Sequence, residues 1–138
     1  MKKIPLMGLA LFALSAQAVE EGPPPESTKH ANLGGYTHFP AKDGEGLYKM
    51  VCAACHMPNA KGASGAGAYP ALAKNEKLAA SAYPVTMVLN GHGAMPSFRG
   101  NMDDAQVAAV VTYVRTHFGN NYTDAVPLDE VKQVRDAK

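Results

Sequence analysis

The pattern of apolar and polar residues along the chain predicts a body built from helices. Its longest regular stripe repeats at helical spacing. The stripe consists of Val107, Val110, Val111, Val114 and Phe118. Asp103 and Gln106 form a capping box at its start, and Gly119 is a natural stop after it. We therefore expect a helix over residues 103–118.

A second helix is expected over residues 43–54. Asp43 can cap its start, and apolar side chains recur at helical spacing between Leu47 and Val51. Gly46 is unfavourable inside a helix, by about 1 kcal/mol relative to Ala. We interpret this glycine as the mark of a close crossing with another helix.

Shorter apolar patterns predict further helices over residues 74–80, 83–90 and 127–138. Pro84 suits a first helical position, and Gly91 ends the same helix. The helix nearest the C-terminus is expected to turn its apolar side chains inward. These side chains are Leu128, Val131 and Val134.

The first 18 residues have the form of a bacterial signal peptide. Two lysines precede an apolar run, and Ala16-Gln17-Ala18 is a small-residue cleavage site. The run is about half of the roughly 20 residues that a membrane-spanning helix needs. We therefore expect cleavage after Ala18, a periplasmic mature protein and no stable membrane insertion. Residues 19–42 show no hydrophobic period, which predicts an extended arm.

Composition and charge narrow the class of partner. The 138 residues have room for one domain, and 13 glycines with 10 prolines suit short helices joined by loops. Residues 1–18 contain two lysines and no acid, so their removal changes the formal net charge from +1 to −1. Such a chain lacks the basic character that binding to nucleic acids or anionic membranes requires.

The segment Cys52-Ala53-Ala54-Cys55-His56 carries the candidate chemistry. Thiols two residues apart can add to the two vinyl groups on one edge of a haem, and the adjacent histidine then lies beneath the iron. This C-x-x-C-H pattern is typical of covalent c-type haem attachment. It predicts one haem c, bound through Cys52 and Cys55, with His56 as the first ligand of the iron.

Three other interpretations of the cysteines are weaker. A disulfide between Cys52 and Cys55 would indicate a thiol redox protein, but no βαβ pattern of the thioredoxin kind surrounds the pair. A structural zinc site needs four ligands, and an iron–sulfur cluster usually takes four cysteines, whereas the chain has two. We therefore favour haem attachment.

A second protein ligand of the iron is expected on a glycine-rich loop in the second half of the chain. Met95 and His92 both lie there. Met95 is favoured because Pro96 stiffens the backbone after it and Phe98 can pack near the haem. His92 remains the alternative, whereas Met87 is expected in the core because it lies on an apolar helix face.

Around these motifs the sequence resembles the class I, mitochondrial-type cytochromes c. The resemblance covers residues 43–119 and includes the closing helix with Tyr113-Val114. Its other segments, in order, are Gly46-Leu47-Tyr48 ahead of the haem motif, Ala68-Tyr69-Pro70-Ala71-Leu72, and Asn90-Gly91-His92-Gly93-Ala94-Met95-Pro96. The expected organisation is a signal peptide (1–18), an arm (19–42), a cytochrome c domain (43–119) and a C-terminal extension with room for a short helix (120–138).

The resemblance implies an all-α cytochrome c fold, with several short helices around one covalently attached haem. It implies that the first and last helices of that domain cross near Gly46 and Tyr113, where the missing side chain of Gly46 would let Tyr113 approach. It also implies that His56 and Met95 are the two axial ligands. The Nδ1–H of His56 would donate a hydrogen bond to the carbonyl of Pro70, which fixes the tautomer and makes the ligand more basic.

The haem propionates are the point at which the chain departs from this family. Many relatives place a tryptophan near one propionate, and this chain has no tryptophan. Tyr69 and Arg99 are the candidate partners instead. Arg99 is also compatible with an ordinary solvated charge on a loop.

These expectations favour an electron-transfer protein over an enzyme. Two protein ligands would leave no open position on the iron, and Met/His ligation favours a fairly positive potential. The sequence resembles small exported cytochromes that accompany bacterial dehydrogenases. This implies an exported dehydrogenase or another redox protein as electron donor, and a terminal oxidase or another cytochrome as acceptor. A haem peroxidase or gas sensor is the alternative, and it would require Met95 to leave the iron.

Overall fold

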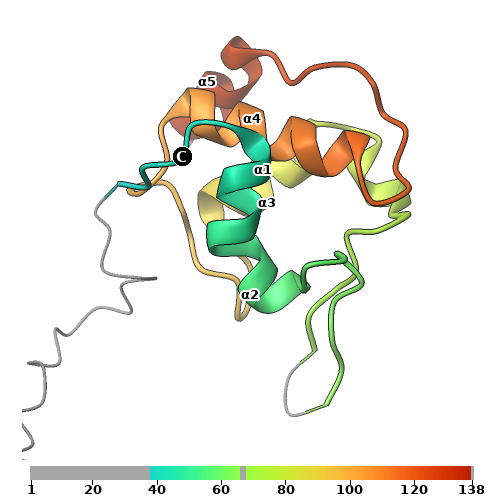
Figure 1. Cartoon of the computed structure of the whole chain (residues 1–138). Coiled ribbons are helices and arrows are strands. Elements are labelled where there is room, and N and C mark those ends of the chain that lie inside the picture. Colours follow the sequence, from blue (N-terminus) through green and yellow to red (C-terminus); the bar gives the residue numbers. More distant parts are fainter. Residues whose placement is uncertain (1–37, 66–67, 138) are drawn as a thin grey trace, which may run out of the picture. The chain divides into compact units, whose positions relative to one another are not determined.

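Figure 1 shows the computed structural model of the chain, in which residues 38–65 and 68–137 are described. These residues form helices joined by loops, without a strand, so the all-α prediction is confirmed. The helical segments are α1 (Gly44–Leu47), the π-helical turn η2 (Tyr48–Cys52), α2 (Ala53–His56), the 3₁₀ turn η3 (Glu76–Leu78), α3 (Ala82–Asn90), α4 (Asp104–Thr116) and α5 (Leu128–Asp136). None of the helices in the described ranges is long and apolar enough to cross a membrane. The predicted signal peptide and the arm up to residue 37 lie outside the described residues.

The segments α1, η2 and α2 follow one another without a break in helical backbone. The run begins as predicted, because the Asp43 carboxylate accepts a 2.8 Å hydrogen bond from the N–H of Gly46. It continues past the predicted end to His56 and stops before Met57, where φ is 66°. The whole C-x-x-C-H motif is therefore held on helical backbone, and its first residue, Cys52, is the last residue of the π turn.

The close crossing of α1 with α4 occurs at Gly44, so the prediction of Gly46 was wrong. A Cβ atom on Gly44 would lie 2.6 Å from the Cβ of Tyr113 and 2.3 Å from the carbonyl oxygen of Ala109. A Cβ atom on Gly46 would instead meet the side chains of Asp43 and Ala41. Two residues of helix correspond to a rotation of about 200°, so Gly44 and Gly46 face nearly opposite sides.

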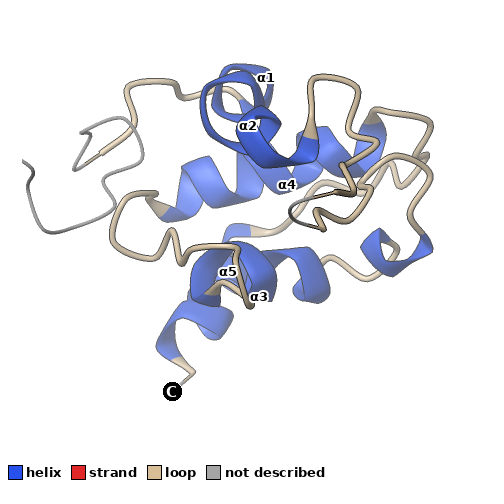
Figure 2. Ribbon diagram, turned by 90° about the horizontal axis from the view of Figure 1, so that it is seen from below, coloured by secondary structure: helices blue, strands red, loops and turns tan. Residues whose placement is uncertain are grey.

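Helix α4 is the central element of the described body and packs against α1, α3 and α5 (Figure 2). Its start is the predicted capping box, in which Asp103 and Gln106 each accept a hydrogen bond from the backbone N–H of the other. It ends at Thr116, two residues earlier than predicted. Phe118 has a φ of 59° and packs against Tyr48, with 4.8 Å between ring centroids. Phe118 therefore leaves the helical stripe but stays in the hydrophobic packing around α1.

Helix α5 packs against α3 and α4. Val131 is fully buried as predicted, but Leu128 is 48% exposed, contrary to the prediction. Val134 is half-buried and packs against the core, so only Leu128, the first residue of α5, departs from the prediction. Val131 takes the centre of the buried face, and Leu128 lies at its solvent edge.

The remaining helices are shorter or shifted relative to prediction. The helix predicted over 74–80 is reduced to the turn η3, while α3 begins one residue early and is ended, as predicted, by Gly91 with a φ of 72°. Long loops therefore precede η3 and α4. These two loops carry the residues of the predicted site that lie outside the first helical run, among them Pro70 and Met95.

Candidate functional site

A cavity of about 450 Å³ lies against the C-x-x-C-H motif. This volume is within the roughly 300–1,000 Å³ typical of ligand and cofactor sites. Segments far apart in sequence supply its wall, including Val51 before the motif, Leu78, Val88 and Phe98, and Val110 and Val114 on α4. The wall is mainly apolar, as a haem ring requires.

His56 lies at the end of α2 and is 7% exposed. Its Nδ1 is 2.9 Å from the carbonyl oxygen of Pro70, a geometry in which Nδ1–H donates to that oxygen. The proton on Nδ1 leaves Nε2 with a free lone pair, which is the form of histidine that binds metals. His56 and Pro70 both line the cavity.

The approach of Pro70 to His56 depends on a glycine in the same loop. The N–H of Gly62 bonds to the carbonyl of His56, and Gly62 has a φ of 66°. A Cβ atom on Gly62 would lie 2.1 Å from the carbonyl oxygen of Tyr69 and 2.8 Å from the carbonyl carbon of Pro70. A side chain at Gly62 would therefore push the acceptor carbonyl away from the histidine.

Cys52 and Cys55 are both free thiols, half-buried, and part of the cavity wall. Burial, and then the neighbouring Cys55, raise the pKa of the Cys52 thiol to about 12. A thiol that stays protonated at neutral pH is a poor attacking group in disulfide exchange. Cys52 is therefore unsuited to be the attacking thiol of a thiol redox protein.

Tyr48, the first residue of η2, holds the end of the motif in place. It is buried, and its hydroxyl donates a 2.7 Å hydrogen bond to the carbonyl of Met57, the residue after His56. Burial, with smaller contributions from Cys52 and Tyr113, raises the pKa of Tyr48 to about 12. The hydroxyl therefore keeps its proton, and with it the hydrogen bond, across the neutral range.

The loop after α3 brings both sixth-ligand candidates to the cavity. His92 and Met95 pair through two backbone hydrogen bonds of 3.0 Å, and a Cβ atom on Gly91 would lie 2.5 Å from the Met95 carbonyl oxygen. Met95 is half-buried, whereas His92 is exposed, and both line the cavity. The tight turn thus presents Met95 on a wall that belongs to a different element from His56.

Two predicted residues lie elsewhere than expected. Arg99 does not line the cavity, because its guanidinium donates to the side-chain oxygen of Asn90 and to the carbonyl of Arg135. Tyr69, the other candidate for a propionate, does line it. Met87, expected in the core, is half-buried and forms part of the cavity wall.

Sequence reasoning also missed polar residues on the cavity wall. Asn75, Lys77 and Tyr83 line it from η3 and the start of α3. No motif or spacing in the sequence marks them, since only the fold brings these two short segments beside the haem motif. Lys77 is a cation on the wall, the role in which Arg99 had been predicted.

The helical fold and the motif beside an apolar cavity define a c-type cytochrome. Residues 39–114 match the family described as "Cytochrome C oxidase, cbb3-type, subunit III", and the chain belongs to this family.

Among similar proteins, the fructose dehydrogenase cytochrome subunit of Gluconobacter japonicus is 36% identical over 108 residues, which cover 67% of this chain and 22% of that protein. Cytochrome c6 of Leptolyngbya boryana is 38% identical over 76 residues, 54% of this chain and 88% of the relative. Cytochrome c-551 of Bacillus subtilis (strain 168) is 28% identical over 103 residues, 75% of this chain and 87% of the relative. The chain thus spans less than a quarter of the first relative and most of the other two.

Membership of this family establishes covalent haem c, with its iron, as the cofactor, and it supports electron transfer by a haem c protein. The residues present fit that group, because the free thiols, a histidine with a fixed tautomer and an apolar wall meet at one cavity.

Proposed function

We propose that this protein carries electrons on a single haem c bound to Cys52 and Cys55, with His56 and Met95 as the axial ligands of its iron. The observation that carries the proposal is that all four residues line one apolar cavity, although η3 and α3 separate Met95 from the motif in sequence. When bound, the haem supplies one-electron chemistry at its iron.

The chain's own residues orient the ligands and exclude water. The Pro70 carbonyl holds His56 in one tautomer and makes it a better donor. Phe98 and the valines of α4 close the apolar side of the cavity. With two protein ligands, the iron has no open position for a substrate, which favours electron transfer over peroxidase or gas-sensing chemistry. The cytochrome domain that we propose is residues 43–119.

We also propose partners for the haem propionates. Tyr69 and Lys77 both line the cavity and provide a hydroxyl donor and a cation. Arg99 is a weaker candidate, because its guanidinium already donates to Asn90 and Arg135.

We infer that the protein works in the periplasm after cleavage behind Ala18, since residues 1–18 carry the pattern of a bacterial signal peptide. The proposed electron donor is an exported dehydrogenase, and the acceptor is a terminal oxidase or another cytochrome. A relative that is the cytochrome subunit of a fructose dehydrogenase supports a donor of this class.

Haem attachment can be tested by acid–acetone extraction and visible spectra of the oxidised and reduced protein. We expect haem to stay with the denatured protein, and a variant with both Cys52→Ser and Cys55→Ser to lose covalent haem, since the chain has no other cysteine. Ala53→Ser, which changes the same turn but keeps both thiols, is the matched control. Extraction of haem from the unmodified protein would contradict the proposal.

A further inference from the structure

The C-terminal helix α5 is joined to the loop that carries Met95 by hydrogen bonds of Arg135. This arginine, in the last turn of α5, donates to two carbonyls in that loop and to a carboxylate at the start of α4. They are the carbonyl of Arg99 at 2.7 Å, the carbonyl of Met102 at 2.9 Å and the carboxylate of Asp104. The side chains of Arg135 and Asp104 are 23% and 26% exposed, so the ion pair is largely shielded from solvent.

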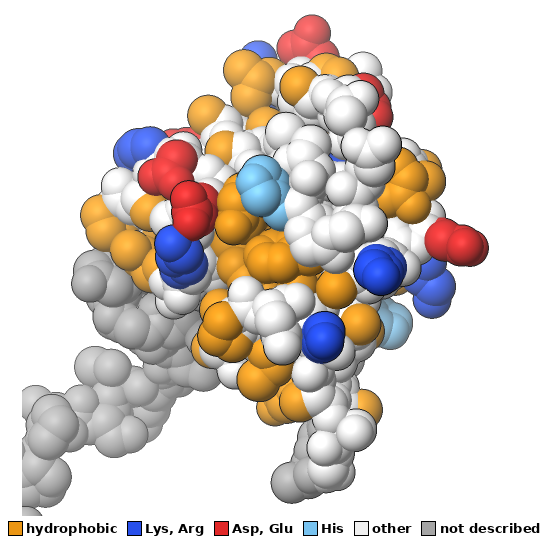
Figure 3. All heavy atoms as spheres, turned by 45° about the vertical axis from the view of Figure 1, so that its right-hand side comes forward, with side chains coloured by type: hydrophobic (Ala, Val, Ile, Leu, Met, Phe, Trp, Pro, Cys, Tyr) orange, Lys and Arg blue, Asp and Glu red, His pale blue; other side chains and the backbone are white. Residues whose placement is uncertain are grey.

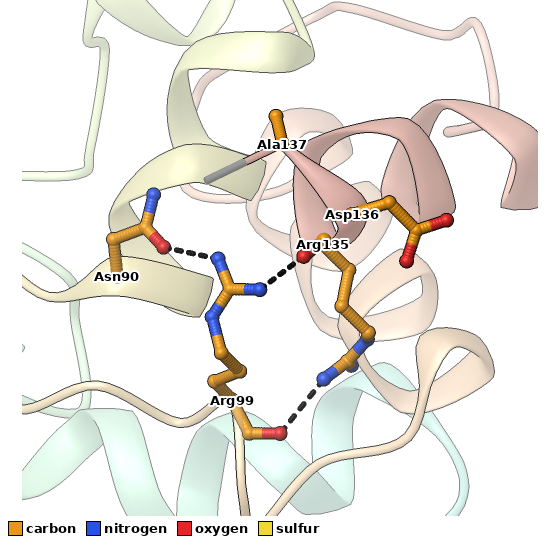
Figure 4. Close-up of a pocket in the computed structure, with 5 residues that line it drawn as sticks. All are labelled: Asn90, Arg99, Arg135, Asp136 and Ala137. Carbon is orange, nitrogen blue, oxygen red and sulfur yellow. Dashed lines mark hydrogen bonds between the residues drawn. The ribbon is translucent and has the colours of Figure 1, made fainter.

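The connection also runs in the opposite direction, as Figure 4 shows. The guanidinium of Arg99 donates to the carbonyl of Arg135 and to the side-chain oxygen of Asn90, the last residue of α3. Asn90 precedes the Met95 loop, and Arg99 follows Met95. The last turn of α5 is therefore connected to both sides of Met95.

The two residues that separate Arg99 from Pro96 are also bonded to α3. The Ser97 hydroxyl donates to the Leu89 carbonyl at 2.6 Å, and the N–H of Phe98 donates to the Val88 carbonyl at 3.0 Å. These bonds fix residues 97 and 98 on α3. A shift of the backbone at Arg99 would pull on the two residues that lie between it and Pro96.

Helix α5 is itself firmly held, so it can act as an anchor. Val131 is fully buried against α3 and α4, and the Ser81 hydroxyl, just before α3, donates to the Glu130 carboxylate at 2.8 Å. The position of Arg135 is therefore fixed by the packing of α5 against two other helices.

We propose that α5 is a clamp on the sixth-ligand loop, with Arg135 as a positioning residue that keeps Met95 on the iron. The proposal rests on the ligation proposed above. A neutral thioether competes with external ligands only while its loop is held in place. The apparent affinity of a competitor is its intrinsic affinity multiplied by the fraction of molecules in which Met95 is off the iron.

Imidazole binding to the ferric protein, followed by absorption, measures that fraction. We expect Arg135→Ala to keep its covalent haem but to raise the apparent affinity for imidazole about tenfold or more, as the open fraction increases. Hydrogen exchange at the amides of residues 91–102 should become faster in the same variant. Arg135→Lys, which keeps the charge but loses the planar fork, should fall between Arg135→Ala and the parent.

Two control variants separate a clamp from a general loss of stability. Lys132→Ala removes an exposed charge from the same helix, where Lys132 pairs with Asp129 at 3.8 Å, and should behave like the parent. Asp43→Ala removes the cap of α1, far from the clamp in sequence, and should lower the free energy of unfolding without the selective gain in imidazole affinity.

Three results would contradict the clamp, and one of them would also contradict the proposed ligation. Parent-like imidazole affinity and loop exchange in Arg135→Ala would refute the clamp alone. A gain in Asp43→Ala that matches Arg135→Ala at equal loss of stability would reduce Arg135 to a general stabilising residue. If the parent bound imidazole as tightly as Met95→Ala does, the proposed ligation would fail, and the clamp with it.

Discussion

At the scale of single residues, the orientation of His56 depends on a glycine in the following loop, Gly62. The acceptor of its Nδ1–H is the Pro70 carbonyl, and that carbonyl reaches the histidine because Gly62 leaves room for the backbone of Tyr69 and Pro70. Gly62 also has a φ of 66°, which only glycine adopts without strain. One glycine thus satisfies both a conformational and a steric requirement of the proposed ligand.

Replacing Gly62 by Ala should therefore affect both stability and redox behaviour. We expect the free energy of unfolding to fall by about 1–3 kcal/mol, because the backbone conformation is strained and the Cβ overlaps the loop. Loss of the Pro70 hydrogen bond would make His56 a weaker donor, so the reduction potential should rise. Gly100→Ala is the matched control, since a Cβ atom there meets nothing within 4 Å. Denaturant unfolding and potentiometric titration measure the two effects, and equal potentials for the two variants would contradict the proposed role.

The proposed ligand Met95 can be tested by substitution. Met95→Ala should open the sixth position, so that the ferrous haem binds carbon monoxide and the reduction potential falls, because a thioether favours the reduced iron. His92→Ala should leave both properties unchanged. Met50→Ala is a control on an exposed methionine that does not line the cavity. The opposite pattern for the first two variants would identify His92 as the ligand.

The residues of the site differed in how far sequence could predict them. The motif is contiguous, so its chemistry was readable without the fold, and the glycines and proline around Met95 marked the second loop. Arg99 looked equally suitable as a cation near the haem, but it lies between Asn90 and Arg135. Lys77 could not be found in advance, because its place on the cavity wall follows from packing of η3 and carries no local pattern.

At the scale of helices, local sequence signals predicted where a helix starts better than they predicted which residues touch another helix. The caps predicted at Asp43 and at the Asp103–Gln106 box were correct, because a cap is formed by residues close in sequence. Contacts between helices depend on which face of each helix meets the other, and a cap does not report this face. The resemblance assigned the crossing to Gly46, although Gly44 makes it.

The corrected crossing gives a paired test. Gly44→Ala would bring a Cβ atom against the backbone of α4, and we expect overpacking to cost about 1–3 kcal/mol of unfolding free energy. Gly46→Ala should cost much less, because its nearest neighbours belong to its own N-terminal segment and the helix gains propensity. Chemical denaturation of both haem-containing variants measures the difference. Equal losses would show that the crossing does not depend on the missing side chain.

At the scale of the whole described body, residues beyond 119 are part of the packing. Arg115 on α4 is fully buried and donates to the Leu78 carbonyl and to the carboxylate of Asp124. The Arg115 side chain holds the pKa of Asp124 below its ordinary value. Together with the burial of Val131, these bonds make the C-terminal extension part of the packed body. Its presence is therefore no argument for a partner.

The surface charge and the similar proteins say more about whether the contact with a redox partner is lasting or transient. On the face seen in Figure 3, hydrophobic side chains gather at the centre, and charged side chains lie around them singly or in small groups. Electron carriers that find their partners by diffusion use complementary charge to raise the rate of encounter. A surface of this kind instead favours a lasting contact, as in a cytochrome subunit of a dehydrogenase, the class to which one relative belongs.

We therefore predict that the protein, purified from its native host at moderate ionic strength, is recovered in a complex with a dehydrogenase. Transient redox contacts bury less than roughly 1,200 Å², whereas a stable subunit contact is larger and more apolar. Its electron-transfer rate should accordingly change little as salt is raised, because screening weakens charge steering and leaves apolar contacts intact. Mass measurement of the purified protein and stopped-flow reduction at several salt concentrations test both points. Recovery as a monomer, with rates that fall steeply as salt is raised, would identify a soluble shuttle instead.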